Sequence, residues 1–307
     1  MTLSANRDQP IAMNYSLTTS SNTTDSLSLP APAKLNLMLH ITGRRDDGYH
    51  ELQTVFQFLD HCDQLHFTRR DDDQLRLLTD FPGLKPQDNL IIKAAKLLQR
   101  HCNIQQGADI SIDKILPAGG GLGGGSSDAA TTLVALNKLW NCRLGDDQLA
   151  QLGLALGADV PIFIHGFAAW AEGVGERVKP ISPPEYWYLV IHPGVHVSTA
   201  DVFSNKHLTR DSKPIKFASA LVAKPRNDCE SLVRSLYPEV DKALVWASQF
   251  GPTLMTGTGA CIFSHFDDPS KAEEIQAKVP GSWHSFVAKG ANYSALYRAL
   301  HPCSEQP

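Results

Sequence analysis

The stretch PAGGGLGGGSSDAA, residues 117–130, carries the strongest structural signal in the chain, because it places six glycines within eleven residues. The preceding segment, ADISIDKIL, alternates apolar and polar residues as a strand does, and residues 126–140 carry apolar side chains at helical spacing. A strand, a glycine-rich turn and a helix N-terminus form a typical phosphate site, since bare backbone N–H groups can point inward and the helix dipole favours an anion. The stretch therefore predicts a loop that surrounds phosphate.

Two other nucleotide-binding loops fit this stretch less well. A Walker loop needs Lys and then Ser or Thr after its last glycine, whereas Gly125 is followed by Ser126. The glycines also fit GxGxxG, but a dinucleotide fold then requires a second strand that ends in an acidic residue, and Asp146 and Asp147 begin a predicted helix instead. A flexible linker is disfavoured by the strand and helix patterns on either side.

The end of the glycine run raises a question of charge. Ser126 and Ser127 can cap the helix or offer hydroxyls to phosphate or Mg²⁺. Asp128 lies in the first helical turn, where it favours the dipole but repels phosphate unless a metal or a lysine intervenes.

Composition excludes several classes of protein. The 307 residues suffice for about two domains. The net charge of −4 provides no general surface for nucleic acid or an anionic membrane, and no apolar run approaches the ~20 residues of a membrane span. The six cysteines form no CxxC pair, which indicates idle thiols in a reducing compartment. A cytoplasmic protein is expected.

The first 29 residues differ from the rest of the chain. Eleven of them are Ser or Thr and they contain no apolar signal-peptide core, so we expect residues 1–29 to be a disordered extension. Arg7 is their only arginine, which disfavours a plastid transit peptide.

Strand and helix patterns alternate after this extension. Strands are predicted at 35–41, 64–70, 74–80 and 108–116, and helices at 90–102, with Asp88 as the cap, and at 146–156. Pro161 interrupts the next apolar run, so 157–176 is expected to form buried strands. Prolines before the strand around Leu189 indicate a domain boundary between Gly166 and Pro184.

Several residues outside the loop are candidates for chemistry, although each also has an ordinary structural interpretation. Asp159 precedes a proline, where a turn residue is common, and Lys34 is the only cation in an apolar strand, where an edge lysine facing water is common. Asn36 shares the face of Lys34. Tyr49 and His50 follow a turn and offer a possible stacking platform for a base. TGTGACIF, residues 256–263, has the appearance of a second tight glycine loop.

Four segments taken together resemble the GHMP kinase superfamily: PAKLNLMLHITGRRDDGYHEL, LPAGGGLGGGSSDAATTLVALN, LGADVPIFI and TGTGACIF. The likeness runs from about Pro30 to about Leu300. PAKLNL and GYH are its most specific parts, and they resemble the members that act on a cytidine-diphosphate-linked alcohol. The resemblance implies an α+β fold with an ATP-binding domain of ribosomal protein S5 domain 2-like topology over 30–171, a ferredoxin-like domain over 172–300, a tail over 301–307, and an active site between the domains.

The resemblance also implies an activity. ATP would phosphorylate the 2-hydroxyl of a diphosphocytidyl methylerythritol, with Mg²⁺, in the non-mevalonate route to isopentenyl diphosphate. The partner is then a small molecule with a cytidine diphosphate group, not nucleic acid or membrane, and the protein a monomer or weak homodimer. Another small-alcohol kinase, acting for example on homoserine or mevalonate, and a non-catalytic nucleotide-binding protein remain as alternatives.

Residue roles follow from the same resemblance. Asp159 would accept the hydroxyl proton and Lys34 would orient the hydroxyl and stabilise its charge. Asn36 would face the substrate, Tyr49 and Phe203 would sandwich the cytosine, His50 would read its edge, and Thr199 lies in the same segment as Phe203. Ser127 is a candidate Mg²⁺ ligand, and the carboxylate ligand is left unassigned. The ATP contacts would be Lys114, Pro117, Ala118, Gly119, Gly120, Gly121, Leu122, Gly123, Gly124, Gly125, Ser126 and Ser127.

Overall fold

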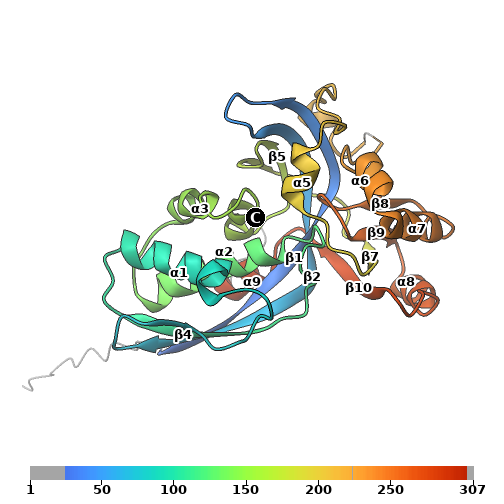
Figure 1. Ribbon diagram of the computed structural model, residues 1–307. Helices are drawn as coiled ribbons and strands as arrows, with labels where there is room; N and C mark the ends of the chain where they lie inside the picture. The colour runs from blue at the N-terminus through green and yellow to red at the C-terminus, as the bar shows by residue number, and fades with distance from the viewer. Residues whose placement is uncertain (1–24, 223, 303–307) are drawn as a thin grey trace, which may run out of the picture.

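Two long antiparallel strands run through both halves of the molecule (Figure 1). The computed structural model describes residues 25–222 and 224–302. β1 (Ser26–Arg44) and β2 (His50–Arg70) pair along their whole length, and their register shifts between Pro32 and Lys34 and again between Asn36 and Met38. Because side chains alternate along a strand, these irregularities re-aim Lys34 and Asn36 relative to the rest of β1.

The other strands extend this ribbon into one sheet within the described residues, in the order β3-β4-β2-β10-β7-β9-β8. In addition, β1 and β5 pair with β2, and β6 pairs with β5. The remaining strands are β3 (Leu75–Leu77), β4 (Gly107–Asp113), β5 (Ala169–Gly173), β6 (Arg177–Pro180), β7 (Trp187–His192), β8 (Thr253–Met255), β9 (Ile262–Phe266) and β10 (His284–Ala291). β10 joins the two halves, since it pairs with β7 and, at Gly290 and Ala291, with β2.

Helices cover the sheet in two groups (Figure 1). They are α1 (Leu90–His101), α2 (Gly124–Leu139), α3 (Asp146–Leu154), α4 (Val160–His165), α5 (Thr199–Ser204), α6 (Glu230–Leu236), α7 (Pro238–Ala247), α8 (Pro269–Gln276) and α9 (Ala295–Leu300). One apolar core lies between α1, α2, α4 and the strands β2 and β4, and a second lies between α6, α7 and the strands β7 and β9.

Most predicted elements are present, and three local predictions are wrong. Residues 160–165 form α4 rather than a strand, because Pro161 lies in the first helical turn, where its missing N–H costs no hydrogen bond. The cap of α1 is Asn89, whose side chain accepts from the N–H of Ile91, and not Asp88. The segment 64–70 is the end of β2 rather than a separate strand.

The expected boundaries also need correction. β1 begins at Ser26, so Ser26–Leu29 are not part of an extension; residues 1–24 lie outside the described residues. A boundary at 171/172 would cut β5, which pairs with β2. We place it at 181–186, between β6 and β7. The chain then returns to its first half, because α9 packs on β1 and α4.

None of the described helices has the length and apolar character that crossing a membrane requires. Cys62, Cys102, Cys142, Cys229 and Cys261 are free thiols.

Candidate active site

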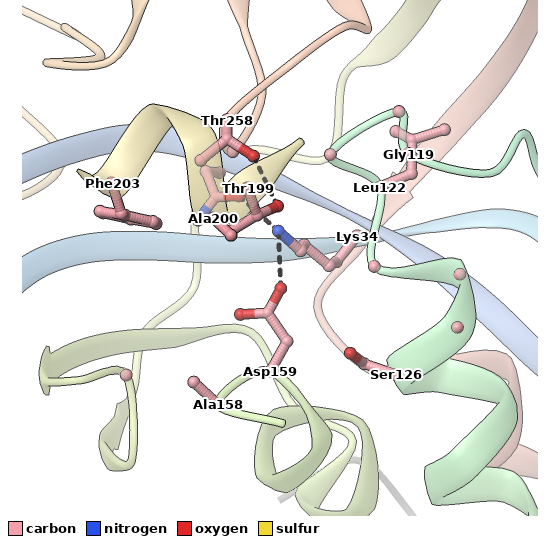
Figure 2. Close-up of a pocket in the computed structure, with 18 of the residues that line it drawn as sticks. Lys34, Gly119, Leu122, Ser126, Ala158, Asp159, Thr199, Ala200, Phe203 and Thr258 are labelled. Atoms are coloured by element: carbon pink, nitrogen blue, oxygen red, sulfur yellow. Dashed lines mark hydrogen bonds and ion pairs between the residues drawn. The ribbon is translucent and has the colours of Figure 1, made fainter. Parts of the chain in front are cut away.

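A cavity of about 790 Å³ brings together residues that are far apart in the sequence. Figure 2 shows its walls, which come from β1, the glycine loop, the segment before α4, and α5. The cavity is lined by nearly all residues predicted for the site: Lys34, Asn36, Tyr49, His50, Lys114, the loop from Pro117 to Ser126, Asp159, Thr199 and Phe203. Ser127 is the exception. It is fully buried, and its hydroxyl has no hydrogen-bond partner in the described chain, so Ser126 and not Ser127 offers a hydroxyl to the cavity.

Lys34 and Asp159 form an ion pair in this cavity. Nζ of Lys34 lies 3.2 Å from Oδ2 of Asp159 (Figure 2). Only 2% of Lys34 is exposed, and an ammonium buried so deeply requires partners. Asp159 is half-buried, with 34% of its side chain exposed, so one carboxylate meets both the lysine and the cavity. Lys34 is therefore not the water-facing edge lysine that its strand alone suggests.

Hydrogen bonds hold the lysine in place. Nζ of Lys34 donates to Oδ1 of Asn36 at 2.5 Å, which confirms that the two side chains share a face of β1. Nδ2 of Asn36 donates to Oγ1 of Thr54 on β2, and its backbone N–H donates to Oγ1 of Thr256. The backbone N–H of Lys34 donates to the carbonyl of Leu122 in the glycine loop. The ammonium is thus fixed between the two sheet strands and the loop.

Asp159 owes its position to the start of α4. It is the residue before the helix, yet in the described structure its side chain makes no capping hydrogen bond to that helix. The carboxylate is therefore free to reach Lys34. The buried Val160 and Pro161 fix the start of this short helix, and the side chain of Asp159 therefore has a defined direction into the cavity.

The glycine loop has the conformation that its composition predicts. Gly119, Gly121 and Gly123 have φ of 67°, 75° and 75°, a region that favours glycine. The loop also packs closely on residues 256–261: a Cβ on Gly121 would lie 2.2 Å from the carbonyl oxygen of Thr256. The backbone N–H of Cys261 donates to the carbonyl of Gly120. Some of the glycines therefore allow close contact with the second half of the chain, in addition to lining the cavity.

The first turn of α2 lines the cavity, and its backbone N–H groups have no acceptor within the helix. The helix begins at Gly124, its N-cap Gly123 offers no side chain, and the first N–H groups of a helix have no partner within it. The dipole adds positive potential at this end. The arrangement fits an anionic phosphate chain.

A buried charge cluster that includes Asp128 lies beside the start of α2. Nζ of Lys114 donates to Oδ2 of Asp63 at 2.5 Å and to Oδ2 of Asp128 at 2.7 Å. Burial opposes the charge of Lys114, but the two carboxylates raise its pKa. Burial raises the pKa of Asp128, against the effect of Lys114. Lys114 thus gives Asp128 a counter-charge, which is one of the two conditions that the sequence set for an aspartate at this position.

Removing this lysine should destabilise the protein. Lys114→Met leaves Asp63, which is fully buried, and Asp128 without their common counter-charge. We expect the free energy of unfolding to fall by about 3–5 kcal/mol, measured by urea denaturation. Lys93→Met on the exposed face of α1 is the matched control and should change it by less than about 0.5 kcal/mol. Equal stability of the two variants would contradict the cluster's role.

Aromatic and polar side chains form the opposite wall. The rings of His50 and Phe203 lie 5.0 Å apart between centroids, tilted by 33°. Tyr49 lies in the turn between β1 and β2 and is 61% exposed. Thr199 at the start of α5 shares a hydrogen bond of 2.9 Å with Thr258. The second glycine loop, which contains Thr258, thus closes on this wall, since Gly257 and Thr258 also line the cavity.

Some supporting residues were not found from the sequence. Asp63 accepts from the backbone N–H groups of Ile115 and Leu116 and so positions the start of the glycine loop. Asn227 donates to the carbonyls of Met255 and Gly257 and so shapes the second loop. An aspartate within a strand and an asparagine within a loop carry no motif, so no sequence signal distinguishes them.

The chain is similar to known proteins. The GHMP kinases N terminal domain matches residues 89–167, and the GHMP kinases C terminal domain matches residues 214–285. The 4-diphosphocytidyl-2-C-methyl-D-erythritol kinases of Pseudomonas paraeruginosa and Pseudomonas aeruginosa (strain LESB58) are each 56% identical over 274 residues, which cover 89% of this chain and 97% of each relative.

Solved structures agree with these matches. A crystal structure of 4-(cytidine 5'-diphospho)-2C-methyl-D-erythritol kinase has a TM-score of 0.75 and 32% identity, and the match covers 86% of this chain and 99% of that chain. Homoserine kinase from Cytophaga hutchinsonii, at 19% identity and a TM-score of 0.62 over 89% of this chain and 96% of that chain, shares the fold. The chain therefore belongs to the GHMP kinases and, within them, to the family of the 4-diphosphocytidyl-2-C-methyl-D-erythritol kinases.

Proposed function

We propose that the protein transfers the γ-phosphoryl group of ATP to the 2-hydroxyl of 4-diphosphocytidyl-2-C-methyl-D-erythritol, giving the 2-phosphate and ADP. This proposal depends mainly on one observation: the buried Lys34 lies 3.2 Å from the half-buried Asp159, in the same cavity as the glycine loop and the His50–Phe203 wall. Phosphoryl transfer to an alcohol requires a carboxylate near the hydroxyl, a cation for developing charge and a cradle for the phosphates. The cavity provides all three, and the relatives at 56% identity bear the name of this reaction's kinase.

In the proposed reaction the 2-hydroxyl oxygen attacks the γ-phosphorus and the bond to the β–γ bridging oxygen breaks. The carboxylate of Asp159 accepts the hydroxyl proton, and the ammonium of Lys34 stabilises negative charge on the attacking oxygen and the transferred group. Asp159 also orients the hydroxyl before the transfer. The side chain of Asn36 holds the ammonium of Lys34 in position for this role.

The glycine loop binds ATP in this proposal. The first N–H groups of α2 and the backbone between Gly119 and Ser126 contact the phosphates, and the Lys114 cluster keeps Asp128 from repelling them. The bonds of the loop to residues 256–261 hold it in one conformation before ATP arrives. A fixed cradle needs little rearrangement during the transfer.

The cavity wall also fits a magnesium ion. Oδ1 of Asp128 is buried without a hydrogen-bond partner among the described residues, and the hydroxyl of Ser126 lies on the same helical turn. These oxygen atoms suit Mg²⁺, which takes most of its other ligands from phosphate and water. No group of three or more His, Cys, Asp or Glu side chains that could hold a metal occurs in residues 25–222 and 224–302. When bound, the ion neutralises charge on the β- and γ-phosphates.

Tyr49, His50 and Phe203 bind the cytosine in this proposal. Truncating the exposed Tyr49 should therefore weaken binding of the cytidine substrate and leave ATP binding unchanged. For Tyr49→Ala we expect the KM for the cytidine substrate to rise about tenfold, because stacking on one aromatic contributes about 1–3 kcal/mol, while the KM for ATP and the melting temperature stay unchanged. Tyr49→Phe, which keeps the ring, should resemble the wild type in steady-state kinetics. An equal rise in both KM values would argue against a separate base site.

A substrate panel tests the function. ADP release by the purified protein is measured with Mg-ATP and, in turn, 4-diphosphocytidyl-2-C-methyl-D-erythritol, its uridine analogue, homoserine and mevalonate. Turnover that is fastest with the cytidine compound supports the proposal. Turnover only with homoserine or mevalonate would assign the site to another alcohol, and ATP binding without any turnover would indicate a nucleotide-binding protein that does no chemistry.

A further inference from the structure

Arg210 holds one ring nitrogen of His50 from behind the cavity wall. Nε of Arg210 donates to Nε2 of His50 at 2.9 Å. His50 is 7% exposed and lines the cavity, whereas Arg210 is not among the described residues that line it. The arginine therefore contacts the residue that faces the ligand without facing the ligand itself.

The orientation of the guanidinium is set by backbone. Nη1 of Arg210 donates to the carbonyl of Leu208 at 3.1 Å. Nη2 donates to the carbonyls of Phe203 and Asn205 at 2.9 and 2.7 Å. All three nitrogen atoms of the planar group are thus engaged, and one of their acceptors belongs to Phe203, whose tilted ring contacts the ring of His50. The arginine locks the histidine and the aromatic of α5 into one unit.

This contact determines where the imidazole carries its proton. A guanidinium has donors only, so Nε2 of His50 must accept. A neutral imidazole has one N–H, which is then at Nδ1. Burial, followed by the positive charges of Arg210 and Arg44, lowers the pKa of His50, which favours the neutral ring.

The other nitrogen is available to a ligand. Nδ1 of His50 forms no hydrogen bond with the described part of the protein and is not one of its buried unpartnered atoms. Cytosine and uracil both present an acceptor at O2, but at N3 cytosine presents an acceptor and uracil an N–H donor. A fixed Nδ1–H donor therefore pairs with N3 of cytosine and opposes N3–H of uracil, which leaves two donors face to face.

We propose that Arg210 is a positioning residue for base selection: it fixes His50 as the Nδ1–H tautomer, and that tautomer selects cytosine over uracil. The inference rests on the proposed function for the identity of the base. The tautomer, in contrast, is a property of the ligand-free protein and can be measured without turnover.

The first arm of the test is spectroscopic. In ¹⁵N-labelled full-length protein at neutral pH, the ring nitrogens of His50 are assigned by comparison with His50→Asn. We expect a protonated Nδ1 and an unprotonated Nε2 in the wild type, and a shift of population toward the Nε2–H tautomer in Arg210→Met. A purely structural role for Arg210 would not change which nitrogen is protonated.

The second arm is kinetic. The ratio of kcat/KM for the cytidine substrate to that for its uridine analogue should fall about tenfold in Arg210→Met, with an unchanged KM for ATP. Arg210→Lys retains a cation that can only donate hydrogen bonds. Its preference for the cytidine substrate over the uridine analogue should therefore be greater than that of Arg210→Met. Thermal melting of each variant tests whether the fold is retained.

The outcomes separate the two claims. An Nε2–H tautomer in the wild type, or an unchanged ratio in Arg210→Met, would overturn the inference even if the kinase reaction is established. Absence of turnover with both nucleotides would overturn the proposed function and base selection with it, while the spectra would still show whether Arg210 sets the tautomer.

Discussion

Asp159→Asn is expected to lower kcat for the proposed transfer by at least about a hundredfold without unfolding the protein. The amide occupies the space of the carboxylate but cannot accept the hydroxyl proton. It also removes the counter-charge of Lys34, which is 2% exposed and only 3.2 Å away. Steady-state ADP release with saturating ATP and cytidine substrate provides the measurement.

Two further variants make this result specific. Asp88→Asn makes the same charge change elsewhere on the cavity wall and should keep kcat near the wild-type value. If Lys34 and Asp159 act as a unit, Lys34→Met combined with Asp159→Asn should cost little more than the worse single change. Full activity of Asp159→Asn, or equal losses in it and Asp88→Asn, would contradict the assigned role.

Gly121→Ala is expected to destabilise the protein strongly. Its φ of 75° disfavours a side chain, and the added Cβ would lie 2.2 Å from the carbonyl oxygen of Thr256, a backbone atom that cannot move alone. We expect a loss of about 3 kcal/mol in the free energy of unfolding, measured by urea denaturation, together with weaker ATP binding.

Gly125→Ala is its matched control. A Cβ there would meet only Cδ1 of Leu90 at 3.5 Å, an ordinary contact, and alanine favours the helix that contains the residue. Stability should be unchanged or slightly higher. ATP affinity, measured by calorimetry, should nevertheless fall if the phosphates lie against this turn. An unchanged affinity would place the phosphates elsewhere in the cavity.

The strongest local signals in the sequence gave correct predictions because they reflect local chemistry. The glycine run predicts a strand, a loop and a helix, and the structure has β4, the loop and α2 in that order. The spacing of two between Lys34 and Asn36 predicts a shared face, and the two side chains are hydrogen-bonded. Neither pattern could show that Asp159 meets Lys34, because this pairing depends on the path of the chain; only the resemblance to the superfamily implied it.

Other features depend on tertiary contacts and were therefore not predicted. Asp63 comes just before the strand predicted at 64–70 and belongs to no motif, yet it is fully buried in the continuous β2 and bonded to Lys114. Pro161 suggested a strand, although the first turn of a helix tolerates it equally well. The return of α9 onto β1 has no local signal, since its helical pattern does not specify which core it covers.

The product of the reaction tests the central claim most directly. The protein is incubated with Mg-ATP and 4-diphosphocytidyl-2-C-methyl-D-erythritol, and the mixture is followed by ³¹P and ¹H–³¹P correlation NMR. We predict one new phosphomonoester coupled to the methylerythritol at its 2-position, formed in equal amount with ADP. Phosphate on another hydroxyl, or ADP accompanied only by inorganic phosphate, would contradict the proposed reaction.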